Sequence, residues 1–260
     1  MKAPHEYGDE LVSIIKADFN ATFRSLFRAF EAERDDEIFR VRTRMPHPFA
    51  NLALVNRIPT PALLQEALEG LCEETFPSCF MSTEPVPSES LRILEESGFG
   101  LVEAMPLMSL DLDRLEVPPV PDGCTLDRAG PEQHEAWVDA MAGGYELPRE
   151  LVDPMGPGSM FEQSHDCAIE FHVVHHEGRP VASSMHTVRD GVVGIYCIAT
   201  HPDLRGRGLG AWVTAAPLRG FHDAGHRTAV LQASEMGAPV YRRLGFSEHG
   251  TIALHVRVPD

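Results

Sequence analysis

Apolar residues recur at helical spacing over the first thirty positions of the chain. This period predicts one long amphipathic helix whose apolar stripe belongs to the core. The residues of the stripe are Leu11, Ile14, Ile15, Phe23, Leu26, Phe27 and Phe30.

The C-terminal half reads instead as short strands. The runs CAIEFHVVHH, PVASSMHTVR and VVGIYCIAT are joined by EGR and DG, which are short enough for hairpins. We therefore expect a sheet that begins antiparallel. A glycine-rich turn (RGRGLG) follows, then a helix to about Ala224, a strand TAVLQAS, a helix GAPVYRRL and a last strand TIALHVRV. Ahead of the hairpins, residues 143–163 are rich in Gly, Pro and Met, as in a loop with short helical turns or a lid over a pocket.

A proline-rich stretch, EVPPVPDG at 116–123, interrupts the pattern and predicts a linker between domains at 1–115 and 124–260. An internal repeat supports two copies of one unit, because aligning Phe99 with Phe246 (an offset of 147) superposes helix, Gly-Phe and strand in both halves. The first copy lacks the glycine turn and Tyr241. If these features carry the chemistry, only the second copy can perform it.

The net charge of the chain limits the classes of partner that it can bind. The chain has 22 basic and 39 acidic side chains, a formal net charge of −17, which argues against a nucleic-acid partner and favours a cationic acceptor. Five cysteines without CxxC spacing fit a reducing compartment. The first residues show no signal-peptide pattern, and no apolar run reaches the ~18 residues of a membrane span. We expect a cytoplasmic protein without a membrane partner.

The glycine turn is the strongest chemical signal. Backbone N–H groups at a helix start attract anions, and glycines let the backbone come close to them. A nucleoside-triphosphate loop is excluded because no Gly-Lys-Ser or Gly-Lys-Thr is present. A dinucleotide fingerprint is met by Gly206, Gly208 and Ala211, but six residues (THPDLR) separate the strand from the first glycine, and hairpin-linked strands precede it.

Coenzyme A fits better. Arg205-x-x-Gly208-x-Gly210 resembles the acetyl-CoA signature [RQ]xxGx[GA] of the GNAT N-acetyltransferases. IYCIATHPDLRGRGLG resembles the fourth strand and pyrophosphate loop of that family, and LQASEMGAPVYRRLGF its fifth strand and fourth helix. The resemblance implies an α/β fold (an α+β mixed sheet) of tandem-GNAT type with a degenerate first copy. It also implies direct transfer of an acetyl or short acyl group from acetyl-CoA to an amine in a ternary complex, by a monomer or homodimer.

The resemblance implies roles for individual residues. Tyr241 stands where the family carries its general acid, and the amide near Ile198 would act as oxyanion donor. Ser234 stands where the family often has Asn. The residues implied to bind the cofactor are Ile198, Ala199, Thr200, Arg205, Gly206, Arg207, Gly208, Leu209, Gly210, Ala211 and Ser234.

The general base stays open. Tyr196 and Ala229 occupy the positions where relatives carry a base, and neither is a carboxylate, so water is one alternative proton acceptor. Other candidates are Glu146, Glu150, Glu162, His172 and His186.

For the acceptor pocket we expect an apolar wall formed by Tyr145, Met155, Met160 and Phe161, with ordinary loop packing as the alternative for these residues. Tyr196 is a further candidate substrate contact. We expect no metal, and interpret the HxxHH run at 172–176 as a solvated turn. A catalytically silent acyl-CoA-binding module and a dinucleotide-binding oxidoreductase remain as alternatives.

Overall fold

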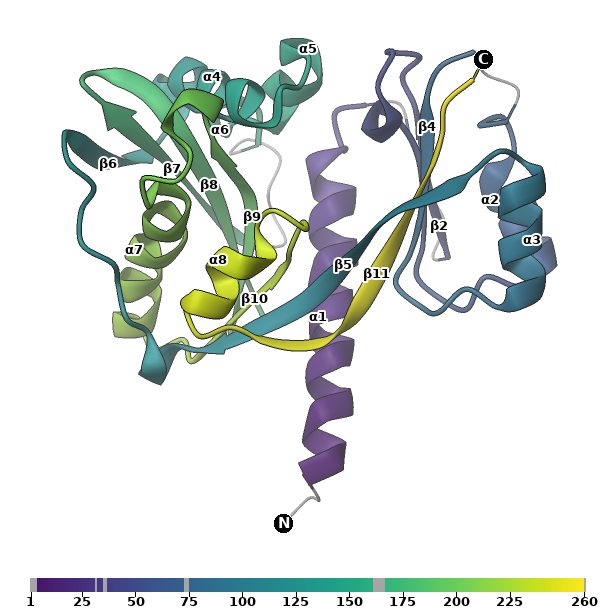
Figure 1. Ribbon diagram of the computed structural model, residues 1–260, viewed down its shortest axis with the longest axis horizontal. Helices are drawn as coiled ribbons and strands as arrows, with labels where there is room; N and C mark the ends of the chain where they lie inside the picture. The colour runs from purple at the N-terminus through teal and green to yellow at the C-terminus, as the bar shows by residue number, and fades with distance from the viewer. Residues whose placement is uncertain (1–3, 31, 35–36, 73–74, 161–166, 260) are drawn as a thin grey trace. The chain divides into compact units, whose positions relative to one another are not determined.

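The computed structural model of the chain describes residues 4–30, 32–34, 37–72, 75–160 and 167–259 (Figure 1). By its contacts the chain forms two compact units. Unit 1 comprises residues 1–107, 232–235 and 249–260, and unit 2 comprises residues 108–231 and 236–248. The domain boundaries expected from the sequence stay a prediction.

Unit 1 is built on a mixed sheet in the order β1-β2-β3-β4-β11. Strand β3 runs parallel to β4, while the other neighbours are antiparallel. Its elements are α1 (Pro4–Leu26), β1 (Ala32–Arg34), β2 (Ile38–Arg42), η1 (Pro48–Ala50), β3 (Asn51–Val55), α2 (Pro61–Leu68), β4 (Ser78–Ser82), α3 (Ser88–Glu96), and parts of β5 (Gly100–Asp111) and β11 (Ser247–Arg257). Leu64 of α2 and Leu94 of α3 pack with Phe80 and Phe99 in its core.

The long N-terminal helix expected from apolar spacing is confirmed as α1. The rings of Phe19 and Phe23, and of Phe27 just after the helix, form a tilted row with centroids 5.2 and 5.0 Å apart. The helix ends at Leu26, so Phe27 and Phe30 of the predicted stripe lie beyond it. The prediction that the whole stripe belongs to the core is wrong for Ile14, which is 38% exposed.

Unit 2 holds the glycine turn. Its sheet order is β10-β9-β8-β7-β6, with β10 parallel to β9 and the other neighbours antiparallel. The elements are η2 (Leu112–Arg114), β6 (Cys124–Ala129), η3 (Pro131–Gln133), α4 (His134–Tyr145), α5 (Arg149–Val152), η4 (Asp153–Met155), α6 (Pro157–Met160), β7 (Ala168–His176), β8 (Arg179–Arg189), β9 (Val192–Thr200), η5 (Pro202–Leu204), α7 (Leu209–Asp223), β10 (Thr228–Gln232) and α8 (Ala238–Arg243). A mixed sheet flanked by helices, the expected fold class, is confirmed.

Both predicted hairpins of unit 2 form. Their turns place Glu177-Gly178 and Asp190-Gly191 at positive φ, the backbone that two-residue hairpin turns require. The three strands β7, β8 and β9 therefore follow one another as an antiparallel meander into the glycine turn.

Helices α4 and α7 cover opposite faces of the unit 2 sheet. Trp137 of α4 meets Phe171 edge-on, with centroids 5.1 Å apart, and Phe171 lies opposite Met185 in the register. The next residue, His186, contacts Phe221 of α7 at 5.5 Å. Since neighbouring strand residues point to opposite faces, the sheet lies between the two helices. None of the described helices has both the length and the apolar character needed to cross a membrane.

Candidate functional site

Strands β9 and β10 separate next to the glycine turn. Among the described residues, their parallel register runs from Val192↔Thr228 to Gly194↔Val230 and ends there, whereas β9 continues to Thr200. On its other side β9 stays paired with β8 as far as Thr200. The last part of β9 is therefore paired with β8 on one side without being paired with β10 on the other, which is an arrangement suited to pairing with another extended chain.

A β-bulge marks the same part of β9. The register passes from Met185↔Tyr196 to Ser183↔Ala199, so Cys197 and Ile198 together face Ser184. Cys197 has φ 53°, a left-handed value, and its carbonyl accepts a hydrogen bond of 3.0 Å from the Ser183 hydroxyl. Because the bulge shifts the alternation by one residue, Tyr196 and Ala199 both point to the α4 face.

The glycine turn has the geometry of an anion site. Gly206 and Gly208 have φ 78° and 84°, and a Cβ added to either would meet no atom within 4 Å. Helix α7 starts directly afterwards, and its first hydrogen bond runs from the Trp212 amide to the Gly208 carbonyl. The amides of residues 209–211 precede that bond and have no partner within the helix. A phosphate or pyrophosphate group thus fits over an open, glycine-lined helix start.

Arg205 braces this turn. Its Nε donates to the Thr200 carbonyl at 3.2 Å, and a terminal nitrogen donates to the Gly144 carbonyl at 2.8 Å. The guanidinium therefore holds the end of β9 and the end of α4 together. Arg205 thus supports the turn through the backbone, and its predicted role in cofactor binding stays a prediction. Arg207 is exposed.

Tyr241 is buried in α8, with 7% of its surface exposed. Its ring and that of Phe246 have centroids 5.8 Å apart. Burial raises the pKa of the phenol far above its usual value, and the Thr214 side chain has a smaller, opposite effect on that pKa. The phenol therefore carries its proton at neutral pH, as a general acid requires.

The residues expected around the acceptor lie in varied settings. Tyr145 is 48% exposed at the end of α4, whereas Met155, Met160 and Tyr196 are buried. Phe161 and Glu162 lie outside the described residues. Ser234 follows β10 in the segment 232–235, which belongs to unit 1. The roles predicted for these residues stay predictions.

The two candidate histidine bases lie on the face of the unit 2 sheet that α7 covers. His186 is fully buried and His172 is 7% exposed, with ring centroids 5.2 Å apart. Burial, helped by the positive charge of Arg128, lowers the pKa of His172 to about 4. The interpretation of HxxHH as a solvated turn is wrong for His172, because the sheet alternation turns this ring toward the helix.

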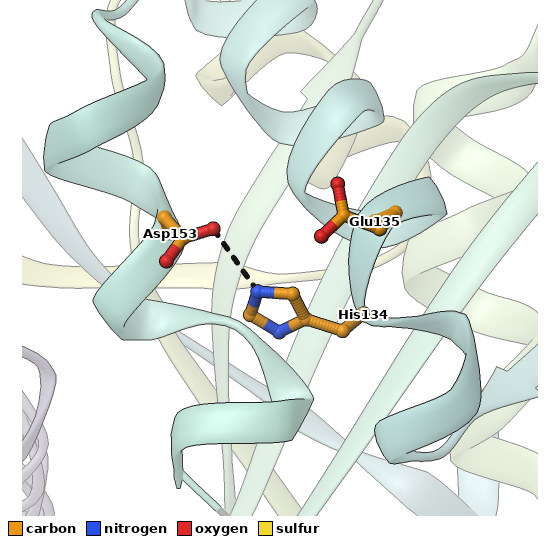
Figure 2. A group of neighbouring side chains, drawn as sticks. All are labelled: His134, Glu135 and Asp153. Carbon is orange, nitrogen blue, oxygen red and sulfur yellow. Dashed lines mark hydrogen bonds and ion pairs between the residues drawn. The ribbon is translucent and has the colours of Figure 1, made fainter.

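Figure 2 shows a cluster that sequence spacing did not reveal, in which the ring of His134 lies between Glu135 and Asp153. The Nδ1 of His134 accepts a hydrogen bond of 3.0 Å from the Gly158 amide. In the neutral ring the proton is therefore on Nε2, which donates to Asp153 at 3.2 Å. Glu135 is paired with Arg149. Both ring nitrogens are thus used within the protein, and the cluster fits a structural latch better than a metal centre.

Comparisons with known proteins agree with this geometry. Residues 168–248 match the family described as the acetyltransferase (GNAT) domain. A solved GCN5-related N-acetyltransferase from Kribbella flavida is 23% identical, with a TM-score of 0.64 over 95% of this chain and 96% of that one. One from Sphaerobacter thermophilus is 16% identical, with a TM-score of 0.63 over 89% and 82% of the two chains. A tandem GNAT protein from the clavulanic acid biosynthesis pathway is 18% identical, with a TM-score of 0.54 over 79% and 74%.

No curated protein matches the sequence. The structural likenesses concern the fold, and the family match adds the acetyltransferase assignment. Together they confirm the expected resemblance: residues 168–248 match the GNAT acetyltransferase domain, and the chain shares the fold of solved GNAT proteins. That the first half is a degenerate second copy stays a prediction.

Proposed function

We propose that this chain transfers an acetyl or other short acyl group from acyl-CoA to an amine. One observation carries the proposal: the pairing of β9 with β10 ends at Gly194, and β9 continues beyond that point into a positive-φ glycine turn at the start of α7. An extended arm along the strand and a pyrophosphate on the helix start are the two groups that such a site suits, and coenzyme A contains both. The GNAT family match supports the same assignment.

The residues would divide the work as follows. Amides of residues 209–211 bind the pyrophosphate, and the edge of β9 at Ile198–Thr200 pairs with the pantetheine arm. The amide of Ile198 lies in the bulge and donates to the acyl oxygen, which is worth about 3 kcal/mol if well aimed. Acyl-CoA itself supplies an activated thioester.

Proton movement completes the reaction. The amine nitrogen bonds to the acyl carbon as the carbon–sulfur bond breaks and the electron pair stays on sulfur. Tyr241 gives its proton to that sulfur, and the nitrogen loses one proton to water. Solvent then restores the proton of Tyr241, so that acyl-CoA and amine become amide and free CoA.

The net charge of −17 favours a cationic amine, since a negative field raises the local concentration of cations. We therefore place polyamines, arylalkylamines and lysine-bearing peptides first among acceptors.

The test is product formation. The chain is incubated with acetyl-CoA and, separately, spermidine, tyramine and a lysine-bearing peptide, and products are identified by mass spectrometry. We expect acetylation of at least one amine, its loss in Gly208→Glu, and its retention in Gly220→Glu. Gly220 is the matched control, since it is exposed on the same helix. Product formation that survives Gly208→Glu would contradict the assigned site.

A silent acyl-CoA-binding module is the second candidate. The residues at the two usual base positions, Tyr196 and Ala229, are both buried and neither carries a carboxylate. Saturable acetyl-CoA binding without any acetylated product across the amines would favour this candidate over catalysis.

A further inference from the structure

We propose that Ser183 is a positioning residue for acyl transfer, because its hydroxyl fixes the direction of the Ile198 amide that is assigned to the acyl oxygen. This inference rests on the proposed function and adds one residue to the same site. Ser183 is a fully buried residue of β8, and its Oγ lies 3.0 Å from the carbonyl oxygen of Cys197. A carbonyl oxygen can only accept a hydrogen bond, so the serine hydroxyl is the donor.

This bond acts on Ile198 because Cys197 and Ile198 share one peptide unit. The carbonyl of Cys197 and the N–H of Ile198 are the two polar groups of that unit, and in a trans peptide they lie in one plane and point in opposite directions. A carbonyl that is held toward β8 by Ser183 therefore turns the Ile198 N–H away from β8. The pairing of β9 with β10 has already ended at Gly194, so that N–H points to the side where the proposed function places acyl-CoA.

The backbone needs a support at this point. Cys197 and Ile198 lie outside the ladder between β8 and β9, because the bulge places both of them opposite Ser184. Strand pairing therefore does not orient their shared peptide unit. Cys197 also has φ 53°, a left-handed value that is strained for a residue with a side chain. A hydrogen bond to the Cys197 carbonyl favours this conformation over the extended one that a strand residue otherwise adopts.

The donor itself sits on a firmly held strand. Strand β8 is paired with β7 along one edge and with β9 along the other. From the α4 layer, the fully buried Trp137 donates a hydrogen bond of 3.0 Å from its Nε1 to the carbonyl of Ser184, the residue after Ser183. A donor fixed in this way can hold the Ile198 amide at one orientation before the substrate arrives, which is what stabilisation of a developing oxyanion requires.

The neighbouring Ser184 provides a matched control. Both serines are fully buried, but within the part of the chain that the structure describes the Ser184 hydroxyl has no hydrogen-bond partner. Successive residues of a strand point to opposite faces of the sheet, so the two hydroxyls have different surroundings. Alanine at either position removes a buried hydroxyl, and only alanine at Ser183 removes the bond to Cys197.

The experiment compares Ser183→Ala, Ser183→Thr and Ser184→Ala with the native chain. Turnover uses acetyl-CoA and the best amine among spermidine, tyramine and the lysine-bearing peptide, and calorimetric titration gives the affinity for CoA, which has no acyl oxygen. We expect Ser183→Ala to lower kcat about tenfold, because the Ile198 amide is still present but less well aimed, while the affinity for CoA changes less than about threefold. Ser183→Thr keeps the hydroxyl and should recover kcat to within about threefold of the native value. Ser184→Ala should leave kcat unchanged.

A spectroscopic readout without turnover accompanies these assays. Infrared difference spectra between ¹³C-carbonyl-labelled and unlabelled acetyl-CoA, bound without amine, isolate the stretching vibration of the thioester carbonyl. A hydrogen bond from the Ile198 amide lowers its frequency below that of acetyl-CoA in solution. We expect the lowered frequency in the native chain and in Ser184→Ala, and a frequency closer to the solution value in Ser183→Ala. Should threonine be too large for the buried site, Ser183→Cys, whose thiol is a weaker donor, should give a kcat between those of Ser183→Ala and the native chain.

The outcomes separate the two claims. An unchanged kcat or an unchanged carbonyl frequency in Ser183→Ala, or an equal loss of kcat in Ser184→Ala, would overturn the role of Ser183 and leave the acyltransferase proposal standing. A native chain that acetylates none of the amines would overturn both.

Discussion

Arg205 donates a hydrogen bond of 2.8 Å to the carbonyl of Gly144, which lies 61 residues earlier in the chain. A second bond, 3.2 Å long, runs from its Nε to the Thr200 carbonyl. The first residue of the RxxGxG signature thus fastens the glycine turn to the end of β9 and to the last turn of α4. The end of β9 and the last turn of α4 thus share this one guanidinium.

Removing the guanidinium should loosen the turn. Arg205→Ala deletes two hydrogen bonds from a charged donor, and we expect acetyl-CoA to bind about tenfold more weakly, by roughly 1.4 kcal/mol. Arg205→Gln keeps a side-chain donor, so its affinity for acetyl-CoA should lie between that of the native chain and that of Arg205→Ala. Calorimetric titration gives the constants, with Arg219→Ala on the exposed face of α7 as the control. An Arg205→Ala affinity equal to that of the control would show that the brace does not shape the site.

Alanine substitutions at Gly144 and at its neighbour Gly143 provide a matched comparison of the packing of α4 on β9. A Cβ at Gly144 would lie 2.6 Å from the Ala199 Cβ and 2.8 Å from the Thr200 amide nitrogen, whereas one at Gly143 would lie 3.3 Å from the His201 ring. We expect Gly144→Ala to destabilise the protein by about 1–3 kcal/mol and to weaken acetyl-CoA binding. Gly143→Ala should be nearly neutral. Thermal melting checks both variants, and equal midpoints would contradict the close packing of α4 on β9.

Acid should unfold the protein partly through His172. Burial lowers its pKa to about 4, against 6.5 in an ordinary setting, so the unfolded chain binds a proton that the native chain does not. The stability from the neutral ring is complete above pH 6.5 and falls as the pH drops toward 4, by roughly 3 kcal/mol. His186 acts in the same direction. Urea unfolding between pH 7.5 and 4.5 should show that the unfolding free energy depends less steeply on pH in His172→Gln than in the native chain. An unchanged pH dependence would contradict the role of His172 in acid unfolding.

The hydrogen bonds of His134 predict that metal ions do not change the stability of the protein. Since Nδ1 accepts from Gly158 and Nε2 donates to Asp153, His134→Ala should cost about 1–3 kcal/mol of unfolding free energy. Glu135→Gln, which breaks only an exposed pair with Arg149, should cost at most about 1 kcal/mol. Melting curves with EDTA and with Zn²⁺ should coincide. A Zn²⁺-dependent rise that EDTA reverses would show that the cluster is a metal site after all.

Local signals predicted much of unit 2. The dipeptides Glu177-Gly178 and Asp190-Gly191 gave the two hairpins, and the glycines at 206 and 208 gave the turn before α7. These features depend on backbone preferences of a few adjacent residues. The order of strand, turn and helix could therefore be written down without a structure.

The remainder depends on partners distant in sequence. Cys197 has φ 53° in a β-bulge that depends on the register with β8. No glycine or other turn-forming residue at this position predicts the bulge from the sequence. The bond from Arg205 to Gly144 joins positions whose proximity only the packing of α4 on β9 creates.

The central claim, a coenzyme A site at the glycine turn, is tested most directly by thermal melting with saturating acetyl-CoA, NADPH or ATP, in the native chain and in Gly208→Glu. At about a hundred times its dissociation constant a ligand adds ~2.7 kcal/mol, which raises the midpoint by roughly 5–10 °C. We predict this rise with acetyl-CoA alone, and its loss in Gly208→Glu. No rise with acetyl-CoA, or an equal rise in the variant, would contradict the assignment of the turn.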